Sequence, residues 1–198
     1  VNVSPPLQWE PAPEGTVDWS RAKAGISEYD PPAFEIGRRL ADAEGAELIG
    51  LTAGGPDAAA PMARKAALAR GLDRVVVVAD ESLRRARSTR TGLVLAAAVR
   101  ALGEVDLVLA GESSIDVGAQ LVPAILAGAL GWPALTQVRS VSGRPGALTI
   151  ERAHRGGSQV LSATGPVVAS VAPDAVAPRL PGMKDILAAG RKPTEELP

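Results

Sequence analysis

Apolar runs alternate with amphipathic segments between residues 30 and 130 of the chain. Three short runs rich in Val, Leu and Ile have the length and composition of strands, at residues 47–53, 74–79 and 106–110. Segments with a helical repeat lie between and after them, at residues 31–44, 58–70, 91–102 and 124–130. Asp30 and Asp57 are predicted to cap the first two helices. This alternation predicts an α/β fold with a doubly wound, mostly parallel sheet and right-handed crossovers.

The pattern changes after Trp132. Shorter strands separated by Gly-rich turns are predicted at residues 135–141, 148–152 and 159–163, as a β-hairpin excursion from the sheet. A buried strand is predicted at 167–171, followed by a short helix at 183–189 and a polar end. Residues 1–29 are predicted to be irregular, because four prolines interrupt their first half.

The most informative stretch of the chain lies between residues 107 and 123, where an apolar strand is followed by small polar residues and then a helix. Ser113 and Ser114 could donate hydrogen bonds to a phosphate, and Asp116 could accept them from ribose hydroxyls or cap the helix. Gly118 would let the backbone approach a ligand closely, and Gln120 could bind an adenine edge or a phosphate. The cluster as a whole is typical of a nucleotide pocket at the carboxyl end of a parallel strand.

A second loop with small residues, Thr52-Ala-Gly-Gly-Pro-Asp57, also follows a predicted strand and precedes a helix. It is neither a GxGxxG sequence nor a P-loop, so a tight turn with an aspartate cap is the alternative interpretation. Because both loops follow parallel strands, we expect them to lie close together. The candidate cofactor-binding residues are Asp30, Ala53, Gly54, Gly55, Gly111, Glu112, Ser113, Ser114, Asp116, Gly118, Ala119, Gln120, Leu121 and Val122.

Composition narrows the possible chemistry further. The chain has no cysteine and a single histidine, His154, which argues against thiol catalysis, thiolate metal sites and histidine-pair metal sites. No catalytic residue is expected, because no G-x-S-x-G sequence is present and the serines have no evident base. A net charge of −1 argues against binding to nucleic acid, and no apolar stretch predicts membrane insertion. A cysteine-free chain is consistent with the cytoplasm.

Several segments together resemble the β subunit of electron transfer flavoprotein and the related FixA proteins. The similarity covers residues 30–197 and includes the polar loop before the helix at 124–130. The other similar segments are Gly71-Leu-Asp-Arg-Val75, Leu130-Gly-Trp-Pro133, Ile150-Glu-Arg-Ala-His-Arg-Gly-Gly-Ser-Gln159, Pro166-Val-Val-Ala-Ser170, Ala177-Pro-Arg179 and the tail from Ile186 to Pro193.

The resemblance implies a Rossmann-like domain of the adenine nucleotide alpha hydrolase type that forms a heterodimer with a larger α subunit. It implies a bound AMP or FAD in this chain, with the redox FAD held mainly by the α subunit. Electrons would come from acyl-CoA-type or other dehydrogenases, with Arg179 and Met183 in partner docking. We therefore expect an irregular segment over 1–29, a nucleotide-binding domain over 30–172 and a partner-docking tail over 173–198.

The chain departs from the family pattern at its amino end and in its signature. Arg155 replaces the acidic residue of the signature turn, and only Val1-Asn-Val3 precedes the prolines, where the family has an apolar strand that contributes to the adenine pocket. Either that strand lies upstream or the pocket is incomplete. Two alternative functions are a stand-alone nucleotide-binding regulatory module of the universal-stress-protein type and an ATP-pyrophosphatase. The absence of an S-G-G-x-D-S loop argues against the pyrophosphatase.

Overall fold

The computed structural model describes residues 2–4, 23–114 and 117–198. Its helices are α1 (Asp30–Glu44), α2 (Pro61–Leu68), α3 (Ser88–Leu102), α4 (Val122–Leu130) and α5 (Met183–Ala189), with 3-10 turns η1 (Pro56–Ala59) and η2 (Glu81–Leu83). Its strands are β1 (Asn2–Ser4), β2 (Lys23–Gly25), β3 (Ile49–Gly54), β4 (Arg74–Ala79), β5 (Leu107–Gly111), β6 (Ala134–Arg144), β7 (Ala147–His154), β8 (Gly157–Ala163), β9 (Val167–Val171) and β10 (Thr194–Leu197).

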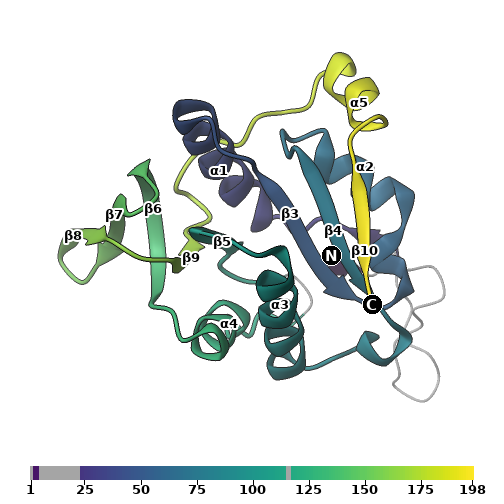
Figure 1. The fold of residues 1–198 in the computed structure, drawn as a ribbon, viewed down its shortest axis with the longest axis horizontal. Coiled ribbons are helices and arrows are strands. Elements are labelled where there is room, and N and C mark those ends of the chain that lie inside the picture. The colour runs from purple at the N-terminus through teal and green to yellow at the C-terminus, as the bar shows by residue number, and fades with distance from the viewer. Residues whose placement is uncertain (1, 5–22, 115–116) are drawn as a thin grey trace.

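The main strands form two ladders rather than one continuous sheet (Figure 1). The first ladder has the order β10-β4-β3 and is parallel throughout. The second has the order β5-β9-β6-β7-β8, in which β5, β9 and β6 pair in parallel and β6, β7 and β8 form antiparallel hairpins. The predicted α/β, doubly wound and mostly parallel architecture is confirmed, with helices packed around the strands.

Helix α1 begins and ends close to the predicted positions. Prolines occupy its first turn, where their missing N–H groups cost no hydrogen bond, and Gly45 ends it in a left-handed conformation with φ of 69°. The prediction that Asp30 is the N-cap is wrong: Tyr29 holds that position, and Asp30 is the first helical residue. The Asp30 N–H donates to the Ser27 carbonyl over 3.2 Å, and its carboxylate lies against Gly111 at the end of β5.

The second predicted helix is divided into two pieces. Residues 56–59 form the 3-10 turn η1, and α2 starts only at Pro61, so the prediction that Asp57 caps this helix is wrong. A proline disfavours helical conformation in the residue before it, and Ala60 is accordingly extended with ψ of 130°. Instead of capping α2, the Asp57 carboxylate accepts a hydrogen bond from Arg84 over 2.9 Å.

Three strands, β1, β2 and β10, lie where none was predicted. The polar end of the chain forms β10, whose charges make ion pairs at the sheet surface, Arg64 with Glu196 at 2.9 Å and Arg74 with Glu195 at 3.2 Å. In the described part of the predicted irregular segment, β1 and β2 form an antiparallel pair in which Asn2 lies opposite Gly25.

Candidate functional site

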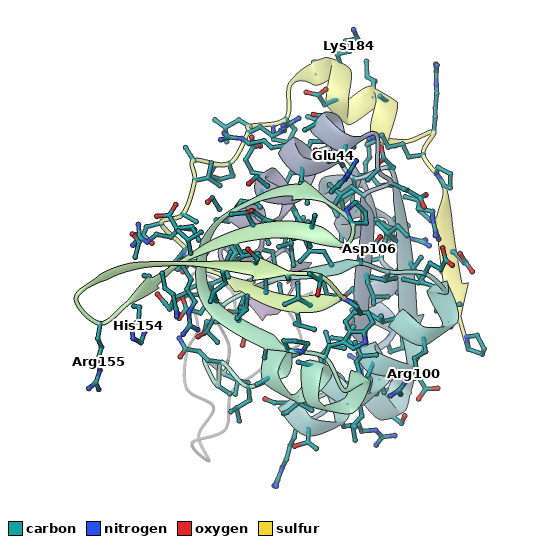
Figure 2. The ribbon with its side chains drawn as sticks, turned by 60° about the vertical axis from the view of Figure 1, so that its left-hand side comes forward. Glu44, Arg100, Asp106, His154, Arg155 and Lys184 are labelled. Atoms are coloured by element: carbon teal, nitrogen blue, oxygen red, sulfur yellow. The ribbon has the colours of Figure 1, made fainter. Side chains whose placement is uncertain are left out.

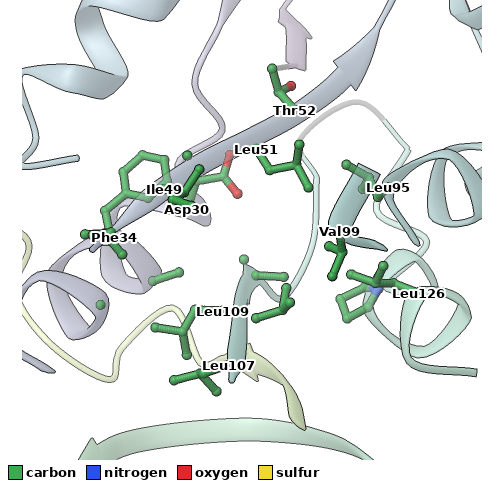
Figure 3. A pocket seen from close by; sticks show the side chains of 18 of the residues that line it. Asp30, Phe34, Ile49, Leu51, Thr52, Leu95, Val99, Leu107, Leu109 and Leu126 are labelled. Carbon is green, nitrogen blue, oxygen red and sulfur yellow. The ribbon is translucent and has the colours of Figure 1, made fainter. Parts of the chain in front are cut away.

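A cavity of about 560 Å³ lies between the two ladders. Figure 3 shows the side chains of β3 and β5 on opposite sides of an open space, with Phe34 of α1 at one end. Leu95 and Val99 of α3 and Leu126 of α4 stand at the other end (Figure 3). The cavity is therefore bounded by two strands and by helices that cover both faces of the sheet.

The walls between the strands are apolar, whereas the mouth of the cavity is polar. The mouth lies where β3 and β5 end, and its polar lining comes from three segments of the chain. These polar residues are Ser27, Asp30, Thr52, Glu112, Ser113, Ser114 and Gln120. Ligands bind at this edge of open parallel sheets, because the loops that follow the strands meet there.

Asp30 and Gly111 form the tightest contact at the mouth. A Cβ atom added to Gly111 would lie 2.6 Å from Asp30 Oδ1 and 2.7 Å from the Tyr29 carbonyl oxygen, so only glycine fits at this position. Burial raises the pKa of the Asp30 carboxyl, and the backbone N–H of Ser27 opposes that rise. A half-buried carboxylate at this place can accept hydrogen bonds from ligand hydroxyls.

The loop after β5 is held by hydrogen bonds of its own. The Gly118 N–H lies 3.0 Å from the Ser114 carbonyl and 3.3 Å from the Ser114 hydroxyl. The Gln120 amide donates to Glu112 over 3.4 Å, and Gln120 has a φ of 55°, a conformation that side chains rarely adopt. These contacts hold the described part of the loop at the cavity mouth.

The sequence did not point to Gln137, which supports this loop from the second ladder. Its amide donates to the Glu112 carboxylate. Gln137 lies at a bulge of β6, between Leu135 and Val138, and has a φ of 59°. Ser27 was missed as well; its position just before a helix is the signal that could have identified it. Thr52, the first residue of the second predicted loop, also lines the cavity.

The structure brings most of the predicted cofactor-binding residues to one cavity. Those among its lining residues are Asp30, Ala53, Gly111, Glu112, Ser113, Ser114, Ala119, Gln120, Leu121 and Val122. Gly54, Gly55 and Gly118 are not among the lining residues. A Cβ on Gly54 would meet Ala58, and one on Gly55 would meet Arg84, each at 3.2 Å. Asp116 lies outside the described residues.

The two predicted docking residues lie in the segment that leads to and begins α5. Arg179 makes an ion pair within the chain: its Nε lies 2.7 Å from Oε2 of the buried Glu35. Arg179, and then Arg39, lower the pKa of Glu35 to about 2 against the effect of burial. Met183 at the start of α5 is 73% exposed and lies near the exposed Leu180 and Leu187 in the sequence.

The described residues form no cluster of metal ligands. Figure 2 shows His154 and Arg155 at the projecting turn between β7 and β8, with both side chains directed outward. Across residues 2–4, 23–114 and 117–198 no group of three or more His, Asp or Glu side chains could hold a metal ion. None of the helices in these ranges has the length and apolar character needed to cross a bilayer.

A comparison with known families agrees with the α/β fold. Residues 15–198 match the electron transfer flavoprotein domain, a range that includes both ladders, the cavity lining and the tail. Because this match extends over most of the chain, it establishes the family. The chain belongs to the electron transfer flavoprotein domain family, a family of electron carriers.

Proposed function

We propose that this chain is the β-type subunit of an electron transfer flavoprotein and that the polar mouth of its cavity binds an adenine nucleotide, AMP or FAD. The observation that carries this proposal is the convergence of hydroxyl, carboxylate and amide groups from three chain segments at the carboxyl ends of β3 and β5. The subunit would have no catalytic residues of its own. It would bind the nucleotide and dock to its protein partners, while a flavin supplies the electron chemistry.

The groups at the mouth suit the parts of an adenine nucleotide. Ser113 and Ser114 offer hydroxyl donors for a phosphate, and Val122, the first residue of α4, lines the same cavity and brings the partial positive charge of a helix N-terminus. The Asp30 carboxylate suits ribose hydroxyls, because a carboxylate accepts hydrogen bonds and repels a phosphate. Gln120 offers an amide that can both donate to and accept from an adenine edge.

The tail of the chain supports a docking role. Leu180, Met183 and Leu187 are between 66% and 89% exposed, and exposed apolar side chains close together in a short segment are typical of protein interfaces. The Arg179–Glu35 ion pair fixes the start of this segment to α1. We propose that the chain forms a heterodimer with an α subunit, and that Met183 contacts an acyl-CoA-type or related dehydrogenase.

Calorimetric titration of the purified chain with AMP, ADP and FAD tests the nucleotide site. GMP, which has a guanine in place of the adenine, is the control nucleotide. The S113A/S114A variant should lose about tenfold or more in affinity, because two hydrogen bonds to a charged group are removed. The matched control is S158A, an exposed serine on β8. A folded chain that binds none of the three nucleotides, alone or with an α subunit, would refute the proposal.

A further inference from the structure

The charged residues that line the cavity are mostly acidic. The carboxylates among them are Asp30 and Glu112 at the mouth, and Glu44, Glu47, Glu104 and Asp106 where β3 and β5 begin. Among the described lining residues only Arg64 is basic, and its guanidinium already pairs with Glu196 at 2.9 Å. A ligand that carries negative charge is therefore repelled by most of the charged groups of the cavity.

Glu112 at the mouth is held differently from the buried carboxylate of α1. An arginine neutralises Glu35, since Arg179 Nε lies 2.7 Å from its Oε2. Glu112 instead accepts hydrogen bonds from two glutamine amides, those of Gln120 and Gln137, and no Lys or Arg in the described ranges pairs with it. An amide is a donor without net charge. The negative charge of Glu112 is therefore held in place without being neutralised.

The two glutamines hold this carboxylate at a cost in backbone strain. Both amides donate to the same oxygen of Glu112, Oε1, while Oε2 accepts no hydrogen bond from the described residues. Gln120 has a φ of 55° and Gln137 a φ of 59°, in the left-handed region that side chains rarely adopt. Strained backbone of this kind is concentrated at functional sites. The position of the carboxylate is thus fixed from two sides, by the loop after β5 and by the bulge in β6.

Glu112 immediately precedes the groups that suit a phosphate. Ser113 and Ser114 follow it in the sequence and line the same cavity, but hydroxyl donors bring no positive charge. The polar residues of the mouth include no Lys or Arg, and Arg87 and Arg90 at the start of α3 are exposed and do not line the cavity. A second or third phosphate would add negative charge near the half-buried Glu112, where solvent screens repulsion less than at an open surface.

We propose that Glu112 is a specificity-determining residue, which makes the mouth bind a nucleoside monophosphate in preference to the corresponding di- and triphosphates. This proposal rests on the nucleotide site proposed above. The carboxylate acts by repelling the additional phosphates, while Gln120 and Gln137 hold it in position. Selectivity of this kind comes from a repulsive group rather than from an added contact.

Calorimetric titration with AMP, ADP and ATP, in the absence of magnesium, measures this selectivity. The parent chain should bind AMP about tenfold more tightly than ADP, and ATP more weakly still, because like charges repel at the mouth. E112Q keeps an oxygen that can accept from both glutamine amides but removes the charge, so the ratio of the two affinities should fall to about twofold. E112K should reverse the preference, since a lysine attracts the second phosphate.

Two further variants separate the charge of Glu112 from other effects. E104Q is the matched control, because Glu104 lines the same cavity at its opposite end, just before β5, and its loss should leave the AMP-to-ADP ratio unchanged. Q137L removes one amide donor and keeps the charge, so it should weaken AMP and ADP binding by similar factors. Added salt should narrow the ratio in the parent chain and leave it unchanged in E112Q, because salt screens the repulsion. The unfolding midpoint of each variant verifies that it is folded.

Three results would overturn the role of Glu112 alone. These are equal affinities of the parent chain for AMP and ADP, an E112Q variant that keeps the ratio of the parent chain, and an E104Q variant in which the ratio falls as far as in E112Q. The last result would mean that the total charge of the cavity sets the selectivity. A folded parent chain that binds none of the nucleotides would instead refute the proposed nucleotide site, and this proposal with it.

Discussion

Strands β9 and β5 lie side by side, have similarly apolar sequences, and differ sharply in burial. Val168 of β9 is fully buried, whereas its register partner Val108 of β5 is half-buried and lines the cavity. The same contrast separates β4, whose four valines are buried, from β3. The comparison teaches that an apolar strand is buried by its two lateral neighbours as much as by the helices above and below it.

The largest effect is expected from truncating the same side chain on the two sides of this comparison. V168A should lower the free energy of unfolding by about 2–3 kcal/mol, because it leaves a void in a closed core. V108A should cost about 1 kcal/mol or less, since part of that side chain already faces the open cavity. Urea unfolding of both variants measures the difference. Equal losses would show that the cavity between the two ladders is closed in solution.

The next largest effect on stability is expected at Gly111, the last residue of β5. G111A should destabilise the chain by about 1–3 kcal/mol, because the new methyl group would overlap Asp30 and the Tyr29 carbonyl. The control is G128A on α4, where nothing lies within 4 Å and alanine is the better helix former. A neutral G111A in thermal unfolding would mean that the start of α1 is not fixed against β5.

The ion pair between Glu35 and Arg179 fastens the segment that connects the two ladders to α1. Because the pKa of Glu35 is lowered from 4.5 to about 2, its contribution is fully present above pH 4.5 and is lost as the pH falls towards 2. E35Q should therefore lower the free energy of unfolding by about 1–2 kcal/mol at neutral pH. It should also flatten the decline of stability with falling pH below about pH 4.5.

The control for this acid titration is E44Q, an exposed carboxyl at the other end of α1 (Figure 2). It should leave the pH profile of the unfolding midpoint unchanged. An E35Q profile that declines as steeply as that of the parent chain would contradict the role of Glu35.

The smallest effect on stability is expected at β10, the outer strand of the first ladder. E196Q removes the exposed ion pair with Arg64 and should change the free energy of unfolding by less than about 0.5 kcal/mol, since solvent screens such pairs. A loss above 1 kcal/mol in urea unfolding would show that β10 depends on its charges rather than on its backbone pairing with β4.

Regular patterns in the sequence predicted most of the fold. The strands at 74–79 and 167–171 and the helix at 183–189 were predicted to the residue, because continuous β-branched runs and a helical repeat depend on local preferences. β10 was missed because Thr-Glu-Glu-Leu is polar and becomes a strand only through pairing with β4. The division into two ladders was also missed, because an apolar run indicates that a strand is buried without indicating by which neighbour.

The candidate site was predictable where small polar residues follow a strand. Ser113, Ser114 and Gln120 were identified on that basis and line the cavity. The double glycine at 54 and 55 does not line the cavity, and a Cβ at these positions would meet Ala58 and Arg84, so close packing is a further reason for glycine there. The support of Glu112 by Gln137 depends on a bulge, which the sequence pattern does not reveal.

That bulge has a mechanical consequence. Strand β6 continues from Gln137 into the long hairpin with β7, which projects from the body of the molecule (Figure 1). Gln137 is tethered to Glu112, so bending the hairpin would pull on the base of the polar loop. A force that bends the hairpin would thus reach the mouth of the cavity through the hydrogen bond between the Gln137 amide and the Glu112 carboxylate.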